Sequence, residues 1–124
     1  MEENLGKVSI APNVLVTIVQ KTAGGTPGVD RLSDNVPGVK RFLGLQTADR
    51  GVQVCVADSK VSVDVYLVAR RGIDLLQMGR ELQLEITRSI EDIVGMSVQE
   101  VNVHIEDVAT ELVRQAGERR DRPR

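Results

Sequence analysis

One cysteine, one histidine and several carboxylates are the residues of this chain whose types could support catalysis. Three runs of alternating apolar residues predict three strands: 52–57, 61–68 and 98–105. Because successive side chains of a strand point to opposite faces, parity places Cys55, Asp64 and His104 on one face, away from the valine and isoleucine side chains. The complete polar face predicted in this way carries Gln53, Cys55, Ser62, Asp64, Tyr66, Asn102 and His104.

A thiol enzyme would need the Cys55 thiol and the His104 imidazole on adjacent strands, in register and sheltered from water. Parity guarantees none of these conditions, and an open sheet face lacks a pocket that excludes solvent. We therefore predict that the chain is not an enzyme and has no catalytic residue. The polar face is then solvated or covered by another subunit. A thiol enzyme using Cys55 and His104 is an alternative.

The amino-acid composition and the lack of known binding motifs also argue against a bound metal or cofactor. One cysteine and one histidine cannot form the His/Cys sets typical of zinc, and no Asp-rich loop has the spacing of a calcium-binding hand. Neither a P-loop nor a dinucleotide fingerprint is present. We predict no metal, no cofactor and no small-molecule substrate.

Nucleic acid is not the expected partner either. The string Gly25-Thr26-Pro27-Gly28 matches the G-x-x-G of KH domains, but a KH loop joins two helices and this one precedes a strand-like segment. The chain has one Phe, one Tyr and no Trp, which nearly excludes a base-stacking platform. Its net charge is −2. A small KH-like RNA-binding module is the alternative function.

Charge and hydropathy favour a cytoplasmic location. The acidic start of the chain is unlike a signal peptide, and the longest apolar run, Val65 to Ala69, is too short to span a bilayer. From residue 110 onward, interleaved acids weaken the case for binding anionic lipid or RNA through the arginines, which are Arg114, Arg119, Arg120, Arg122 and Arg124. We expect a folded domain over 1–109 and a charged, flexible tail over 110–124.

Two helices must support the predicted sheet. The first begins at Pro12 and ends near Ala23, where glycines follow. Its apolar stripe is Val14, Leu15, Ile18 and Val19. A short strand is predicted over 29–32, and residues 33–50 are predicted to form an irregular loop.

The second helix is predicted from Asp74, as the N-cap, to Val94, with Gly95 as the left-handed C-terminal residue. Its apolar stripe is Leu75, Gly79, Leu82, Ile86, Ile90 and Ile93. Gly79 within the helix suggests a close approach to the sheet. Leu84 lies off the stripe and should be partly exposed.

These elements predict an α+β fold: a small mixed three- to four-stranded sheet with two helices packed on one face. The strand before the second helix and the last strand should be parallel, joined by a right-handed crossover. The expected core includes Leu82, Ile86, Ile90 and Val101.

In this order and at these spacings, three stretches resemble the bacterial alkaline-shock, general-stress envelope protein family, long catalogued as a domain of unknown function. Residues 6–12 read GKVSIAP and are similar to the family's G-K-I-x-I-A-P start. Residues 51–68 are similar to its middle, and residues 101–105 to its V-N-V-x-V closing strand. The chain departs from the family pattern at Leu76, where proline is usual, at Gly79, where alanine is usual, and by the insertion of Gly24-Gly25.

The resemblance implies a cytoplasmic, non-enzymatic protein linked to envelope or alkaline stress. It also implies self-association, or attachment to the inner face of the membrane through a membrane-anchored partner. The family has no established catalytic residues, so none is transferred to this chain. We predict a homo-oligomer whose contact surface includes Tyr66, Val68 and Leu84, because these apolar side chains lie off the predicted core.

Overall fold

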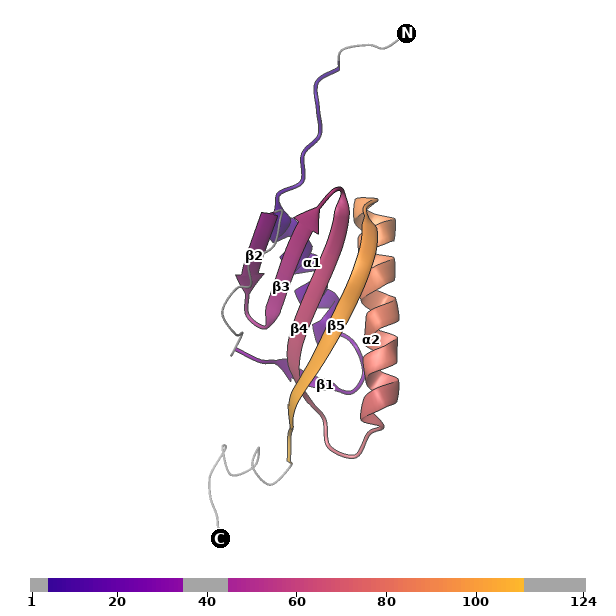
Figure 1. The fold of residues 1–124 in the computed structure, drawn as a ribbon. Coiled ribbons are helices and arrows are strands. Elements are labelled where there is room, and N and C mark those ends of the chain that lie inside the picture. The colour runs from indigo at the N-terminus through magenta and orange to yellow at the C-terminus, as the bar shows by residue number, and fades with distance from the viewer. Residues whose placement is uncertain (1–4, 35–44, 111–124) are drawn as a thin grey trace.

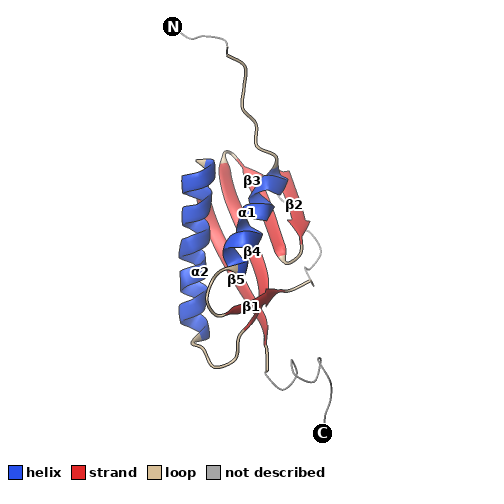
Figure 2. Ribbon diagram, turned by 180° about the vertical axis from the view of Figure 1, so that it is seen from behind, coloured by secondary structure: helices blue, strands red, loops and turns tan. Residues whose placement is uncertain are grey.

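The fold is a single twisted sheet with both helices on one face, in a computed structural model that describes residues 5–34 and 45–110. Figure 1 views the sheet from its open side, with α1 (Pro12–Gly24) and α2 (Leu75–Ser89) behind it. Figure 2 shows the opposite view, in which the two helices lie side by side in front of the strands. The α+β class and the packing of both helices on one face are therefore confirmed.

Five strands form the sheet among the described residues, rather than three or four. They are β1 (Val29–Leu32), β2 (Leu45–Asp49), β3 (Val52–Ala57), β4 (Lys60–Ala69) and β5 (Ser97–Val108). β5 runs parallel to β4 along its whole length, as predicted. The β2–β3, β3–β4 and β1–β4 pairs are antiparallel.

The two edges of the sheet are β2 and β5. A strand has two hydrogen-bonding edges, and β5 occupies one edge of β4 from Lys60 to Ala69. The other edge of β4 is shared by β3, which pairs as far as Val65, and β1, which pairs from Leu67 to Ala69. The order across the sheet is therefore β2-β3-β4-β5. β1 follows β3 along the same edge of β4.

The extra strand arises in the region that we predicted to be an irregular loop. Leu45 to Asp49 pairs with β3 in a regular antiparallel register, ending with Asp49 opposite Val52. Its sequence, LQTAD, has no apolar alternation, so the strand depends on the partner that it pairs with. The rest of that predicted loop, residues 35–44, lies outside the described residues, as does the predicted tail beyond residue 110.

The hairpin between β3 and β4 is set by a two-residue turn. Ala57 pairs with Lys60, and the intervening Asp58 and Ser59 have φ values of 54° and 65°. Positive φ at both central residues defines a type I′ turn, whose twist matches the strands on either side. This turn fixes the register that brings the valines of both strands onto the helical face.

α2 begins where the sequence predicted. The Asp74 side chain accepts a hydrogen bond from the backbone N–H of Gln77 at 3.1 Å, which satisfies one free donor of the first turn. The predicted core residues Leu82, Ile86 and Ile90 are fully buried, and Val101 on β5 is 6% exposed. Met78, which was not in the predicted stripe, is also buried.

The end of the second helix differs from the prediction at Ile93, which is 70% exposed. After Ser89 the helix widens into a π-helical turn, η1 (Ile90–Val94), closed by a bond from the Gly95 N–H to the Ile90 carbonyl. A wider turn carries more residues per revolution, so Val94 rather than Ile93 packs against the core. Gly95 has φ 83°, as predicted for the left-handed C-terminal position.

The buried stripe of α1 is displaced from the one predicted. Leu15, Val16, Val19 and Ala23 are its buried residues, whereas Val14 is 45% exposed. They pack with the inward valines of β3 and β4 in one core cluster. No helix in the described part of the chain is long and apolar enough to cross a membrane.

Candidate functional site

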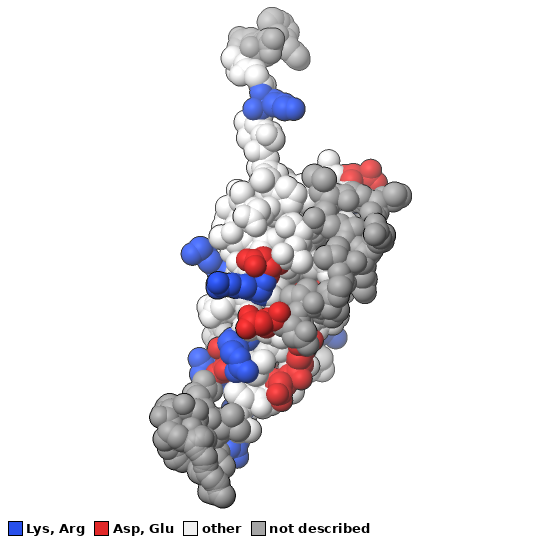
Figure 3. Space-filling view, turned by 90° about the vertical axis from the view of Figure 1, so that its left-hand side faces the viewer, with Lys and Arg blue, Asp and Glu red and all other residues white. Residues whose placement is uncertain are grey.

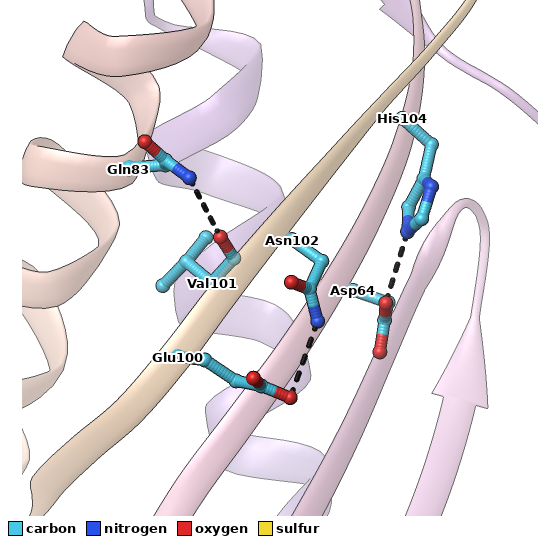
Figure 4. Close-up of polar contacts among 6 residues, drawn as sticks. All are labelled: Asp64, Gln83, Glu100, Val101, Asn102 and His104. Carbon is cyan, nitrogen blue, oxygen red and sulfur yellow. Dashed lines mark hydrogen bonds and ion pairs between the residues drawn. The ribbon is translucent and has the colours of Figure 1, made fainter.

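The outer face of the sheet, opposite the helices, carries a histidine held by two neighbours. His104 on β5 lies opposite Tyr66 on β4, and their rings stack with centroids 4.4 Å apart and planes 10° from parallel. The His104 Nε2 atom lies 2.9 Å from Asp64 Oδ1 (Figure 4). The imidazole is therefore fixed by a ring on one side and a carboxylate on the other.

Cys55 is not part of this arrangement. It lies on β3 opposite Ser62, two strands from His104, with β4 between them. Two strand spacings and the four residues from Ser62 to Tyr66 separate the thiol and the imidazole by well over 10 Å. The Cys55 side chain is buried, and burial raises the pKa of its thiol. The Cys55–His104 pairing that a thiol enzyme requires is thus absent.

Tyr66 lies in an acidic and buried environment. Its side chain is 6% exposed. Burial first, and then the negative charges of Asp64 and Glu106, raise the pKa of the phenol above its usual value. The hydroxyl is consequently neutral well into the alkaline range and does not act as a base at neutral pH.

The three predicted self-association residues occupy different environments. Tyr66 and Val68 are each 6% exposed, so these two side chains offer little accessible surface in the single chain, and their part in a contact stays a prediction. Leu84 is 49% exposed, as predicted. It lines a shallow hollow between α2 and the turn that follows α1, together with Lys21, Thr26, Pro27, Glu81 and Glu85.

The G-x-x-G string forms that turn. It joins α1 to β1 rather than two helices, and the Thr26 hydroxyl donates to the Thr22 carbonyl at 2.8 Å. Gly28 has φ 98°, and an added Cβ would lie 2.8 Å from the Ile73 side chain. Close packing under the start of α2 therefore explains this glycine, and the loop has the position of a structural turn rather than of a KH clamp.

An apolar groove lies between α2 and the outer edge of β5. Leu75, Leu76 and Gly79 line it from the helix, Val103 and Ile105 line it from the strand, and Arg80 and Gln83 stand beside them; its volume is about 310 Å³. We predicted that Gly79 marks a close approach of helix and sheet, and this is wrong. A Cβ added at Gly79 would meet nothing within 4 Å, so the missing side chain opens the groove.

Charge is mixed over the described surface. On the face shown in Figure 3, basic and acidic side chains alternate instead of gathering by sign. Within residues 5–34 and 45–110, no three His, Cys, Asp or Glu residues are grouped so that they could hold a metal ion.

The sequence profile of the alkaline shock protein 23 family, described as having a cell envelope-related function, matches residues 1–110. The chain belongs to this alkaline shock protein family. The resemblance inferred from the GKVSIAP start and the closing strand is thereby confirmed.

Three similar proteins come from Bacillus subtilis and Streptococcus pyogenes. The chain is similar to the uncharacterized protein YqhY of Bacillus subtilis, with 31% identity over 105 residues, covering 84% of this chain and 78% of the relative. It is 21% identical to YloU of the same organism over 106 residues, covering 83% of this chain and 88% of the relative. It is 24% identical to Spy1614 of Streptococcus pyogenes, with the same coverage. No solved structure gives a significant match.

For this member of the family, sequence reasoning missed the groove. The available signal was Gly79, a glycine in a helix interior, which costs about 1 kcal/mol relative to alanine. Such a residue marks either close packing or a gap. The choice between them depends on how far α2 stands from β5, which no periodicity reveals.

Proposed function

We propose that this protein is a non-enzymatic interaction or scaffolding protein of the cytoplasm, that it self-associates, and that it serves the cell envelope. Attachment to the inner face of the membrane would come through a membrane-anchored partner protein. The family's cell envelope-related description supports the envelope link. A link to alkaline stress comes from the same resemblance.

The observation that carries an interaction role is the apolar surface left outside the core. Leu5 and Val8 are 86% and 92% exposed, and Leu76 on α2 is 69% exposed. Single exposed apolar residues are common in monomers. Here they occur on an extended N-terminal segment and beside an apolar groove, which are features that favour contact with another chain.

The polar outer face supports a structural rather than a chemical role. The His104 ring is occupied by Asp64 and Tyr66, and Cys55 is buried on a different strand. A nucleophile with an adjacent base is the feature that a covalent catalyst needs. The described residues of this face hold no such pair. Their proposed role is to pack against one another and to orient β4 and β5.

Co-expression of tagged and untagged copies in a bacterium that carries this chain tests the proposal. Capture of the tagged copy should bring down the untagged copy, and part of both should sediment with the membrane fraction. A wash that removes peripheral proteins should release them. If the tagged copy brings down no untagged copy and the chain stays wholly out of the membrane fraction, the proposal is refuted.

A further inference from the structure

The geometry points to strand donation between copies: the N-terminal segment Lys7–Ile10 of one copy docks along the open edge of β5 in another, with Val8 and Ile10 in the groove beside α2. This inference rests on the proposed self-association and specifies its contact. It is supported by three features of the described residues, namely an open edge, an adjoining apolar groove and an exposed apolar strand-like segment.

The first feature is the free edge of β5. Gln83 on α2 donates from Nε2 to the Val101 carbonyl at 3.0 Å, so this carbonyl points away from β4 (Figure 4). In a parallel strand every second residue directs both backbone groups to the same side. The N–H and C=O groups of Val103 and Ile105 therefore also point outward, and within the described residues no side chain bonds to them. Such an edge is a template for an added strand.

The second feature is the groove that runs beside this edge. Val103 and Ile105 present their side chains to it from β5, and Leu75 and Leu76 present theirs from α2. Peptides that add a strand to a sheet gain affinity from backbone hydrogen bonds and specificity from pockets for alternate side chains. The groove supplies such a pocket where the backbone groups are free.

The third feature is the segment before α1. Figure 1 shows it running away from the body, and Val8 is 92% exposed while Ile10 is 40% exposed. In an extended strand Val8 and Ile10 share one side, with Lys7 and Ser9 on the other. In an extended conformation the segment would thus present one apolar side, although it forms no strand in the single chain.

A second copy is the occupant because the segment cannot reach its own groove. It leaves the body on the β2 side of the sheet, and β5 forms the opposite edge (Figure 1). Crossing three strand spacings takes about 14 Å. Leu5 to Ala11 spans at most about 25 Å when fully extended, so too few residues would remain to pair beside Val103.

Charge agrees with this placement. With Val8 and Ile10 in the groove, Lys7 faces the outer side of the sheet. Glu100, an exposed residue of β5, carries its carboxylate on that side, where Asn102 donates to it at 3.3 Å (Figure 4). Lys7 of the donor then lies on the side of the sheet that carries the Glu100 carboxylate. Because donor and acceptor are different surfaces, the contact is head-to-tail and can extend into chains or filaments.

Sedimentation of the full chain and four variants tests this docking. Val8→Gln removes the apolar side chain from the segment, and Ser9→Gln places the same residue on its other side as the matched control. Gly79→Gln fills the groove, and Gly79→Ala is its control, since a methyl group meets nothing within 4 Å. Thermal unfolding verifies that the Gly79 variants fold. Val8→Gln and Gly79→Gln should each weaken association roughly 10- to 100-fold, and the controls should leave it unchanged.

Mixing the two weakened variants gives the decisive result. Val8→Gln keeps its groove and Gly79→Gln keeps its segment, so an equal mixture should form a 1:1 complex that neither variant forms alone. If the wild type associates but the variants do not weaken it, or if the mixture stays monomeric, strand donation is overturned and self-association stands. If the wild type is monomeric throughout, self-association fails and strand donation fails with it.

Discussion

At the scale of single residues, the outer face of the sheet is built around Tyr66. Its ring stacks on His104, and the neighbouring carboxylates of Asp64 and Glu106 act on its phenol. Burial first, and then these two negative charges, raise the pKa of the hydroxyl and keep it protonated. Tyr66 therefore adds no negative charge to this face at neutral pH.

Titration of the tyrosinate absorbance measures this directly, because the chain has one tyrosine and no tryptophan. The pKa of Tyr66 should exceed the usual value near 10. Asp64→Asn should lower it, since one of the charges that raise it is removed. Glu100→Gln, at an exposed acid that does not act on the phenol, should leave it unchanged. A wild-type pKa at or below 10 would contradict the burial of this side chain.

The same shift makes stability depend on pH. As pH rises, the unfolded chain loses the Tyr66 proton at a lower pH than the folded chain does. The contribution of Tyr66 to the free energy of unfolding is therefore complete below about pH 10, and it is lost as pH rises through the folded-state pKa. In Tyr66→Phe this loss should be absent, which chemical unfolding at a series of alkaline pH values can follow.

Cys55 gives a second test at this scale. Burial disfavours its thiolate, so alkylation of the native chain should be at least roughly tenfold slower than alkylation of the chain in urea at the same pH. The measurement is clean because the chain has a single cysteine. A native thiol that reacts faster than the unfolded one near neutral pH would instead indicate an activated thiolate and revive the thiol-enzyme alternative.

At the scale of the elements, α2 divides into a buried stripe and two exposed sides. Leu82, Ile86 and Ile90 reach the sheet, whereas the groove and the Leu84 hollow lie on either side of that stripe. The widened turn at Ile90 moves Ile93 out to solvent. The helix thus combines a buried stripe with apolar side chains that stay exposed on its other sides.

Two isoleucines of this helix give a matched comparison. Ile86 is fully buried, so Ile86→Ala should lower the free energy of unfolding by roughly 2–5 kcal/mol. Ile93→Ala removes the same atoms at a 70% exposed site and should cost less than about 0.5 kcal/mol. Urea unfolding of both variants measures the difference. Equal losses would mean that the helix is rotated from the position described here.

Elements with a strong local pattern were predictable from the sequence, and those that depend on a partner were not. Alternating valines predicted β3 and β4, and the Asp74 cap and leucine–isoleucine stripe predicted α2. β2 carries no such pattern, because its pairing with β3 defines it. Parity correctly placed His104 and Asp64 on one face, but it could not show that Cys55 lies two strands away, since the order of strands is a property of the whole sheet.

At the scale of the whole molecule, one side chain of the predicted contact surface remains exposed. Leu84→Glu should weaken self-association if the hollow between α2 and the turn after α1 takes part in the contact. Ile93→Glu, which makes the same kind of change at an exposed apolar residue outside this hollow, is its control. An oligomer unchanged in Leu84→Glu would remove this hollow from the contact and leave the β5 edge as the remaining site.

Sedimentation velocity of the wild-type chain over a wide concentration range tests self-association most directly. One copy has a mass of 13.6 kDa. The weight-average mass should rise above this value as concentration increases, and deletion of residues 1–10 should return it to that of one copy. A wild-type chain that sediments as a single 13.6 kDa species at every concentration would contradict a self-associating scaffold.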